Sequence, residues 1–277
     1  MFLGLAAGDA VGTTVEFRTR GSFEPVTGMT GGGPFHLAAG EWTDDTAMAI
    51  CLAESLIECG GWNAIDCMDR FFAWSEDGYA SCTGSCFDIG MTIARALSRY
   101  RQTGHPYAGS TDPRSSGNGA IMRLSPAVIA LADAPEAAVR LAVLQGRLTH
   151  ASSECDLYAE RLARLLITGD PAKAEGALPA GTAEAKISST GYVRHTYEAA
   201  VWAVATTGDF RSAVLRAVNL GDDADTVGAV TGQIAGRLYG ASGIPAEWLD
   251  RLAWCHRIER LADTLLDGKI SPPSAAG

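Results

Sequence analysis

A short acidic stretch near residue 220 holds the densest set of oxygen ligands in this 277-residue chain. Residues 222–226 read Asp-Asp-Ala-Asp-Thr, and the nearest basic residues, Arg216 and Arg237, lie outside them. Carboxylates packed this closely repel one another unless water, a proton or a cation relieves the charge. Acids at a helix N-terminus can also be simple caps, which explains one aspartate well but three aspartates and a threonine poorly. The stretch by itself leaves both capping and a metal site open.

A second acidic stretch, Glu-Trp-Thr-Asp-Asp-Thr at residues 41–46, has the same character. A hydroxyl and two adjacent carboxylates again stand where an amphipathic segment begins, and no Lys or Arg is near. Two helix starts that each offer Thr and Asp oxygens can converge on one cationic centre. Neither stretch contains His, which argues against zinc, whereas an all-oxygen set suits Mg²⁺ or Mn²⁺. Together the two stretches favour a metal site.

The elements that must position these ligands are predicted to be helices. Ala-rich and Leu-rich segments with helical periodicity dominate and strand signals are scarce, so we expect an all-α fold. After an opening helical stripe at residues 3–11, the periodicity predicts helices over 44–59, 62–76, 88–103, 119–133, 135–148, 152–168, 194–207, 210–219, 225–240, 245–253 and 255–267. We expect one domain over residues 1–268 and a disordered tail over 269–277.

Glycines recur at every fourth residue in two of these helices, at 4, 8 and 12 and at 228, 232, 236 and 240. Each glycine inside a helix costs about 1 kcal/mol relative to alanine, so the repeats need a physical reason. Close approach of helix backbones is the simplest one, and we expect both helices to lie near the centre of the fold. A membrane interpretation of this spacing fails because Gln233 and Arg237 interrupt the segment.

The composition narrows the class of protein. Hydrophobic residues make up 47% of the chain, enough for a large core. The formal charge of −10 opposes non-specific binding to nucleic acid or to an anionic membrane. We find neither a signal peptide nor an apolar run of about 18 residues, so we expect no membrane association. Seven cysteines without a dense framework are typical of reduced thiols, which predicts a cytoplasmic location.

Six motifs, spread in order over nearly the whole chain, resemble those of the ADP-ribosylglycohydrolase family. This family includes the dinitrogenase reductase-activating glycohydrolase and the ADP-ribosyl-arginine hydrolases. The matching segments are residues 4–17, 43–46, 88–90, 117–123, 149–150 and 221–226. The resemblance implies a compact single domain of orthogonal helices, with a dinuclear metal cleft where helix ends and loops meet.

The resemblance also implies roles for the acidic residues. The ligands of two divalent cations, Mg²⁺ or Mn²⁺, would be Thr43, Asp44, Asp45, Asp223, Asp225 and Thr226. Asp222 precedes the matched positions and is expected to cap the helix or to support the ligands. Glu16 and Asp88 would be the catalytic carboxyl groups. Their local sequence leaves alternatives open, because Glu16 can be a surface residue on a turn and Asp88 can cap a helix.

A further set of matched residues would bind the ADP-ribose: Gly117, Asn118, Gly119, Arg123, His150 and Tyr192. Asn118, between two glycines, is expected in left-handed geometry. Tyr192 would stack on the adenine. Arg123 can pair with a phosphate or only with an acidic neighbour, and His150 and Tyr192 can also be structural residues. Loops 18–40 and 169–191 match no motif and are expected to shape the approach of the protein substrate.

The implied function is that of a metal-dependent glycosidase. It would hydrolyse the N-glycosyl bond between ADP-ribose and a side chain of an ADP-ribosylated protein, with arginine as the leading acceptor. The same chemistry on serine-linked, nucleic-acid-linked or small-molecule conjugates is an alternative. A non-catalytic ADP-ribose-binding protein is another alternative, which loss of ligand carboxylates would favour, but none is lost at the matched positions.

Overall fold

The structure, a computed structural model, describes residues 1–179 and 181–273. Within these residues helices dominate and extended backbone is limited to isolated bridges, which confirms the all-α prediction. The α-helices are α1 (Phe2–Gly12), α2 (Asp44–Glu58), α3 (Ala64–Asp77), α4 (Met91–Thr103), α5 (Gly119–Met122), α6 (Ser125–Ala130), α7 (Pro135–Arg147), α8 (Ser153–Thr168), α9 (Val193–Ala205), α10 (Phe210–Val218), α11 (Ala224–Tyr239), α12 (Ala246–Leu249) and α13 (Cys255–Asp267).

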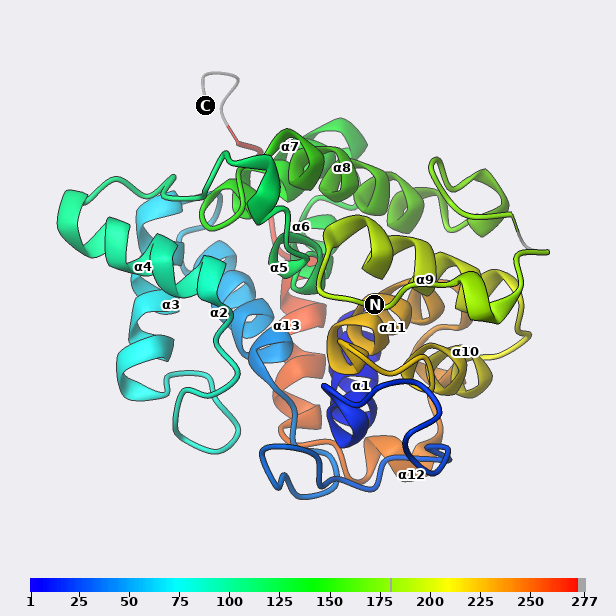
Figure 1. The fold of residues 1–277 in the computed structure, drawn as a ribbon. Coiled ribbons are helices and arrows are strands. Elements are labelled where there is room, and N and C mark those ends of the chain that lie inside the picture. The colour runs from blue at the N-terminus through cyan, green and yellow to red at the C-terminus, as the bar shows by residue number, and fades with distance from the viewer. Residues whose placement is uncertain (180, 274–277) are drawn as a thin grey trace.

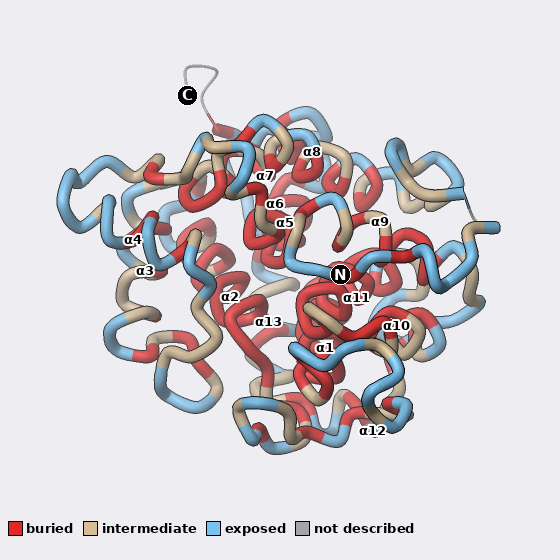
Figure 2. Tube along the Cα trace, in the orientation of Figure 1, coloured by how far each residue is buried: buried red, intermediate tan, exposed pale blue. Residues whose placement is uncertain are grey.

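Helices α1 and α11 form the centre of the molecule (Figure 1). Every residue of α1 is buried, and the tube drawing shows the central pair almost wholly in the buried colour (Figure 2). A Cβ added to Gly8 would lie 2.0 Å from the carbonyl oxygen of Gly228, and one added to Gly4 would lie 2.2 Å from that of Gly232. The glycines therefore allow the two backbones to touch, as predicted, except that Gly240 ends α11 with a φ of 70° and takes no part.

The remaining helices surround this pair. Helices α9 and α10 pack against α11, while α2 and α13 pack against α1 and against each other. Helices α3 and α4 lie outside α2 (Figure 1). Helices α7 and α8 pack against each other and form a layer at the top of the view. The hydrophobic core is shared along the chain, since one cluster contains residues from Phe2 to Leu265. The start of α11 thus lies deep in the molecule, together with all of α1.

Two predicted helices differ from the observed ones. The helix expected over 119–133 is split into α5 and α6, because the chain leaves helical geometry at Arg123 and restarts with Pro126 in the first turn of α6. The helix expected over 245–253 is a single turn, α12. None of the described helices combines the length and the apolar character needed to cross a bilayer.

The loops that matched no motif are held to the core by specific contacts. The Arg20 guanidinium donates to the carbonyl oxygens of Leu220, Glu184 and Ile187 at 3.1, 2.7 and 2.6 Å. This one side chain joins loop 18–40 to loop 169–191 and to the residue before the second acidic motif. At the C-terminus, the amide of Ser271 donates to the carbonyl oxygen of Gly60 at 2.9 Å and Pro273 is buried. The rest of the expected tail, 274–277, lies outside the described residues.

Candidate metal centre and catalytic cleft

The two acidic motifs meet where α2 and α11 begin. Carboxylate oxygens of Asp44, Asp45 and Asp225 lie within 4.8 Å of one another. The Thr43 hydroxyl donates to Asp225 Oδ2 at 3.1 Å, although these residues are 182 positions apart, and the Thr226 hydroxyl donates to Asp45 Oδ2 at 3.3 Å. The convergence expected from the sequence is therefore present in the structure.

Capping does not explain this arrangement. The N-cap residues of α2 and α11, Thr43 and Asp223, make no side-chain capping hydrogen bond. Instead Asp45 Oδ1 and Asp225 Oδ1 are buried with no hydrogen-bond partner among the described residues. A buried carboxylate oxygen without a partner is costly, and a hard cation is the partner that an all-oxygen set of Asp and Thr suits. The donor set thus fits Mg²⁺ or Mn²⁺ chemistry.

The electrostatics of the centre lead to the same conclusion. Burial, and then the neighbouring Asp225 carboxylate, raise the pKa values of Asp44 and Asp45 well above their usual range. Burial, followed by Asp88 and Asp223, has the same effect on the pKa of Asp225. The crowding of these carboxyl groups thus disfavours their charged forms, and a divalent ion bound to the same oxygens would relieve it.

Asp9 lies beside the first acidic motif and was not singled out by the sequence analysis. Its Oδ1 accepts hydrogen bonds from the amide and hydroxyl of Thr43, both at 2.9 Å. Its Oδ2 accepts from the amide and hydroxyl of Thr46 at 3.1 and 2.6 Å. Burial raises the pKa of Asp9 to about 6 despite these four bonds. Asp9 fixes the first turn of α2, and its signal was visible as the one charged residue of the opening apolar helix.

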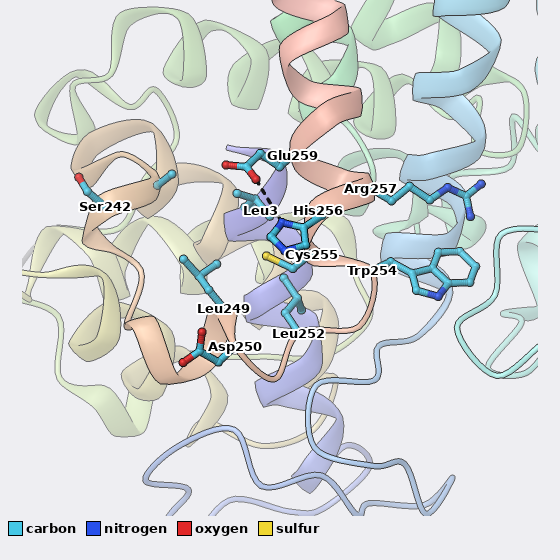
Figure 3. Close-up of a pocket in the computed structure, with 11 residues that line it drawn as sticks. Leu3, Ser242, Leu249, Asp250, Leu252, Trp254, Cys255, His256, Arg257 and Glu259 are labelled. Carbon is cyan, nitrogen blue, oxygen red and sulfur yellow. Dashed lines mark ion pairs between the residues drawn. The ribbon is translucent and has the colours of Figure 1, made fainter.

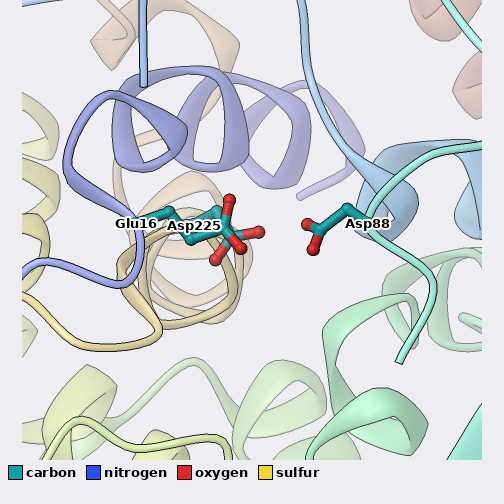
Figure 4. A group of neighbouring side chains, drawn as sticks. All are labelled: Glu16, Asp88 and Asp225. Carbon is teal, nitrogen blue, oxygen red and sulfur yellow. The ribbon is translucent and has the colours of Figure 1, made fainter. Parts of the chain in front are cut away.

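Glu16 and Asp88 lie on the open side of the centre. Their carboxylates and that of Asp225 form a second group with oxygens within 4.8 Å of one another, and Glu16 and Asp225 point toward Asp88 (Figure 4). Glu16 is 2% exposed, so it is not a surface residue, and Asp88 does not cap α4, whose N-cap is Gly90. Burial, then the charge of Asp44, raises the pKa of Asp88 to about 9. Burial, followed by the charges of Asp225 and Asp88, also raises the pKa of Glu16 well above its usual range.

Asn118 connects the loop of residues 117–119, which we call the glycine loop, to the acidic centre. Its side-chain amide donates to Asp223 Oδ2 at 2.7 Å and to the Thr196 hydroxyl at 2.9 Å. Its backbone is right-handed, with φ −85° and ψ −3°, so the left-handed geometry expected for it is wrong. Asn118 begins α5 and needs no left-handed turn there. Asp223 is thereby oriented by a neutral donor, and burial raises its pKa.

His150 lies under the glycine loop. A Cβ added to Gly119 would lie 2.5 Å from His150 Cε1, so glycine is needed there, whereas one added to Gly117 would make a tight contact of 3.1 Å with Nε2. The Thr149 hydroxyl lies 2.9 Å from His150 Nδ1. Burial lowers the pKa of His150 to about 3, which keeps the imidazole neutral. His150 lines the cleft and cannot supply a positive charge to it.

Arg123 and Tyr192 lie outside the cleft wall. Arg123 is fully buried, donates to Gln145 and to the Thr149 hydroxyl, and stacks on Phe71, which removes it from contact with a phosphate in the cleft. It holds Thr149 and so the His150 ring. The Tyr192 hydroxyl donates to Glu154, while Thr190 and Gly191 before it do line the cleft. Asp222 lines the cleft, and its carbonyl oxygen accepts a hydrogen bond from the Phe17 amide at 2.7 Å.

The acidic centre opens into a cleft of about 940 Å³. Among the described residues that line it, none is Lys or Arg, and six are acidic: Glu16, Asp44, Asp88, Asp222, Asp223 and Asp225. A second cavity, of about 670 Å³, lies where α13 begins and is lined by Trp254, His256 and Glu259 among others (Figure 3). Its lining includes no member of the acidic centre, and it matches no motif found in the sequence.

Comparison with known proteins agrees with this geometry. The family model described as ADP-ribosylglycohydrolase matches residues 1–274. The chain is 43% identical over 286 residues to a protein named ADP-ribosylarginine hydrolase Tri1 from Pseudomonas putida (strain GB-1), covering 96% of this chain and 76% of that protein. It is 35% identical over 283 residues to ADP-ribosyl-[dinitrogen reductase] glycohydrolase from Rhodospirillum rubrum, covering 96% and 94%.

A solved structure gives the same result for the fold. The structure titled ADP-ribosylglycohydrolase-related protein complex superposes with a TM-score of 0.83 and is 40% identical in sequence. The match covers 97% of this chain and 96% of that one. Sequence, fold and the acidic centre therefore point to the same family.

Proposed function

The chain belongs to the ADP-ribosylglycohydrolase family, and from that premise we propose that it is a hydrolase that removes ADP-ribose from arginine side chains of modified proteins. The observation that carries the proposal is the convergence of Asp44, Asp45 and Asp225 in an acidic cleft. Relatives at 43% identity from Pseudomonas putida and Serratia proteamaculans are named ADP-ribosylarginine hydrolases, which supports arginine as the acceptor.

The metal ligands of the proposal are Thr43, Asp44, Asp45, Asp223, Asp225 and Thr226, and they would hold two divalent cations, Mg²⁺ or Mn²⁺. Their hard oxygens and the unpartnered Oδ1 atoms of Asp45 and Asp225 support this assignment. Bound cations would orient the ribose hydroxyls and lower the pKa of a coordinated water. Asp9 would keep Thr43 in position through its two hydrogen bonds to that residue.

The proposed catalytic groups are Glu16 and Asp88, and in the view of Figure 4 Asp88 lies opposite Glu16 and Asp225. Hydrolysis forms a bond between the water oxygen and the anomeric carbon of the ribose and breaks the bond from that carbon to the guanidine nitrogen. One proton must leave the water and one must reach the departing nitrogen. Two carboxyl groups commonly carry out these transfers in glycoside hydrolysis, and Glu16 and Asp88 both line the cleft with carboxylate oxygens close to those of Asp225.

The ADP-ribose would lie along the wall formed by Gly117, Asn118, Gly119 and His150. These residues line the cleft beside Asp223, and they present a carboxamide and a neutral ring where no basic side chain lines the described cleft. Tyr192 would reach the adenine from beside Gly191. Arg123 acts indirectly, by holding Thr149 and His150. The seven cysteines are free thiols in the structure, and on that ground we keep a cytoplasmic location in the proposal.

The proposed function is tested with one set of substrates that differ only in the acceptor. Peptides ADP-ribosylated on arginine or serine, and an ADP-ribosylated oligonucleotide, are incubated with the protein and Mg²⁺ or Mn²⁺, and released ADP-ribose is measured. We expect rapid release from the arginine-linked peptide and little from the others. Preference for the serine-linked or nucleic-acid-linked substrate would overturn the acceptor assignment. Tight ADP-ribose binding without any release would favour a non-catalytic binding protein.

A further inference from the structure

Three phenyl rings lie together at the edge of the cleft. Phe17 and Phe35 are 6.4 Å apart between ring centroids and nearly perpendicular, and Phe35 and Phe87 are 5.1 Å apart. Phe17 and Phe35 come from the connection between the first helix and α2, and Phe87 comes from the loop before α4. Phe17 and Phe35 line the cleft, and Phe35 is supported from behind by Phe87. We call Phe17 and Phe35 the aromatic wall.

Two of the three rings are adjacent in sequence to the two proposed catalytic groups. Phe17 follows Glu16 in the chain, and Phe87 precedes Asp88. Glu16 is 2% exposed whereas Phe17 is 65% exposed, so the chain turns the carboxyl inward and the phenyl ring outward at adjacent positions. A large apolar side chain left this exposed beside an active-site cleft often marks a binding surface.

The backbone conformation at Phe17 directs its side chain outward. Its φ of 61° is in the left-handed region, which is strained for a bulky residue. Two hydrogen bonds hold this turn: the amide of Phe17 donates to the Asp222 carbonyl at 2.7 Å, and the amide of Asp222 donates to the Arg18 carbonyl at 2.8 Å. The second acidic motif thus fixes the ring at the mouth of the cleft.

The charged side chains that line the cleft indicate which kind of ligand fits the aromatic wall. No Lys or Arg lines the described cleft, so a cationic group can lie beside the aromatic wall without repulsion from a basic side chain. A guanidinium is planar, weakly hydrated and stacks on aromatic faces. A substituted guanidinium keeps its positive charge, as methylated arginine does.

The wall also lies away from the residues proposed to hold the nucleotide. The glycine loop and Gly191 adjoin Asp223, with Asn118 Nδ2 2.7 Å from Asp223 Oδ2. The aromatic wall adjoins Glu16. In the view of Figure 1 the loops that carry the wall lie below the centre of the molecule, whereas α5 lies above it. The glycine loop and the aromatic wall are therefore separate parts of the cleft lining, the first beside Asp223 and the second beside Glu16.

We propose that Phe17 and Phe35 receive the guanidinium of the ADP-ribosylated arginine and thereby select a planar cationic acceptor. The inference rests on the proposed function and adds to it the residues that determine specificity. The guanidinium stacks on the exposed face of Phe17, while Phe35 closes the edge of the subsite. Neither ring takes part in proton transfer.

The test replaces both rings with leucine, which keeps an apolar side chain and removes the π face. For Phe17→Leu/Phe35→Leu we expect KM for an arginine-linked peptide to rise about five- to thirty-fold, the scale of one partly desolvated cation–π contact. Turnover at saturation and affinity for free ADP-ribose should stay within a few-fold. Phe17→Tyr should keep the wild-type KM. Met91→Ala is the matched control, since Met91 lines the same cleft, is 74% exposed and has no aromatic face.

Two results would overturn the subsite: an unchanged KM in the double variant, or a loss of affinity for free ADP-ribose, which would assign the wall to the nucleotide. Binding of agmatine, followed by NMR in the presence of ADP-ribose and Mg²⁺, separates this test from the proposed function. If the wild type cleaved no arginine-linked substrate but bound agmatine better than putrescine, and lost that preference in the double variant, the proposed function would fail and the subsite would stand. A melting temperature close to wild type shows that the double variant is folded.

Discussion

At the scale of single residues, Asp9 decides the geometry of the first acidic motif. Its four accepted hydrogen bonds fix Thr43 and Thr46 at the start of α2. In Asp9→Asn an NH₂ group would face two of these donors, so one pair must separate. We expect Mn²⁺ affinity to fall about 10- to 100-fold, the usual effect of losing an outer-shell partner, with the helical circular dichroism unchanged. Asp209→Asn, at the surface start of α10, is the control. Wild-type Mn²⁺ affinity in Asp9→Asn would remove Asp9 from the centre.

Glu16 and Asp88 have a different expected signature. Because we propose that they move protons rather than hold the ion, Glu16→Gln and Asp88→Asn should each lower turnover about 10²- to 10⁴-fold. Mn²⁺ affinity, measured by calorimetry, should change by only a few-fold in both. If Mn²⁺ binding disappeared along with turnover, these carboxylates would be ligands and the assignment of roles would be wrong.

Some residues of the site could be recognised from the sequence, and others could not. The acidic motifs were recognisable because hard ligands cluster without basic neighbours. Asp9 was not, because its role depends on how close the fold brings it to Thr43 and Thr46. Arg123 was expected near a phosphate or an acidic neighbour, since sequence reveals its charge but not its depth. In the structure it is fully buried, with Gln145 and Thr149 as its partners.

At the scale of elements, the contact between α1 and α11 positions the whole centre. Gly8→Ala would put a Cβ 2.0 Å from the Gly228 carbonyl oxygen, and the helices would have to separate. We expect urea unfolding to show a loss of at least about 1–3 kcal/mol, the scale of overpacking a tight core. Gly208→Ala is the control, because a Cβ there meets nothing within 4 Å. Equal stability of the two variants would mean that the backbones are not in contact.

Most helices were predictable because their apolar periodicity is regular and their caps are local. The helix expected over 152–168 is observed as Ser153–Thr168, with Ser152 as its N-cap and Gly169 left-handed at its end. The break between α5 and α6 was not recognised, although Pro126 was visible. Proline is tolerated in the first turn of a helix, so its presence marks either a start or a kink, and only the surrounding packing decides between them.

At the scale of the whole molecule, the crowded carboxyl groups link stability to pH and to metal. In the metal-free protein the folded state raises the pKa of Asp88 to about 9 and of Asp9 to about 6, so it binds more protons than the unfolded chain. The free energy of unfolding from this source must fall as pH rises from about 4 to about 9. A divalent cation held by the neighbouring aspartates would bind only the folded state, and its charge would favour loss of those protons.

Thermal unfolding checks this linkage. In EDTA the melting temperature should fall between about pH 5 and pH 9, and the rise on adding Mn²⁺ should be larger at the higher pH. Asp45→Asn, which lacks one of the crowded carboxyl groups, should show a shallower dependence. A metal-induced rise of the same size at both pH values would contradict the proposed competition between protons and cation.

The central claim is that two motifs about 180 residues apart build one metal centre on which hydrolysis depends. The most direct test measures ADP-ribose release from an arginine-linked peptide as a function of added Mn²⁺, for the wild type and for Asp223→Asn. The wild type should be inactive in EDTA and should regain full activity when the metal is restored. Asp223→Asn should stay inactive at every Mn²⁺ concentration, with the wild-type helical spectrum. Full activity of Asp223→Asn in EDTA would contradict both the metal centre and the reaction proposed for it.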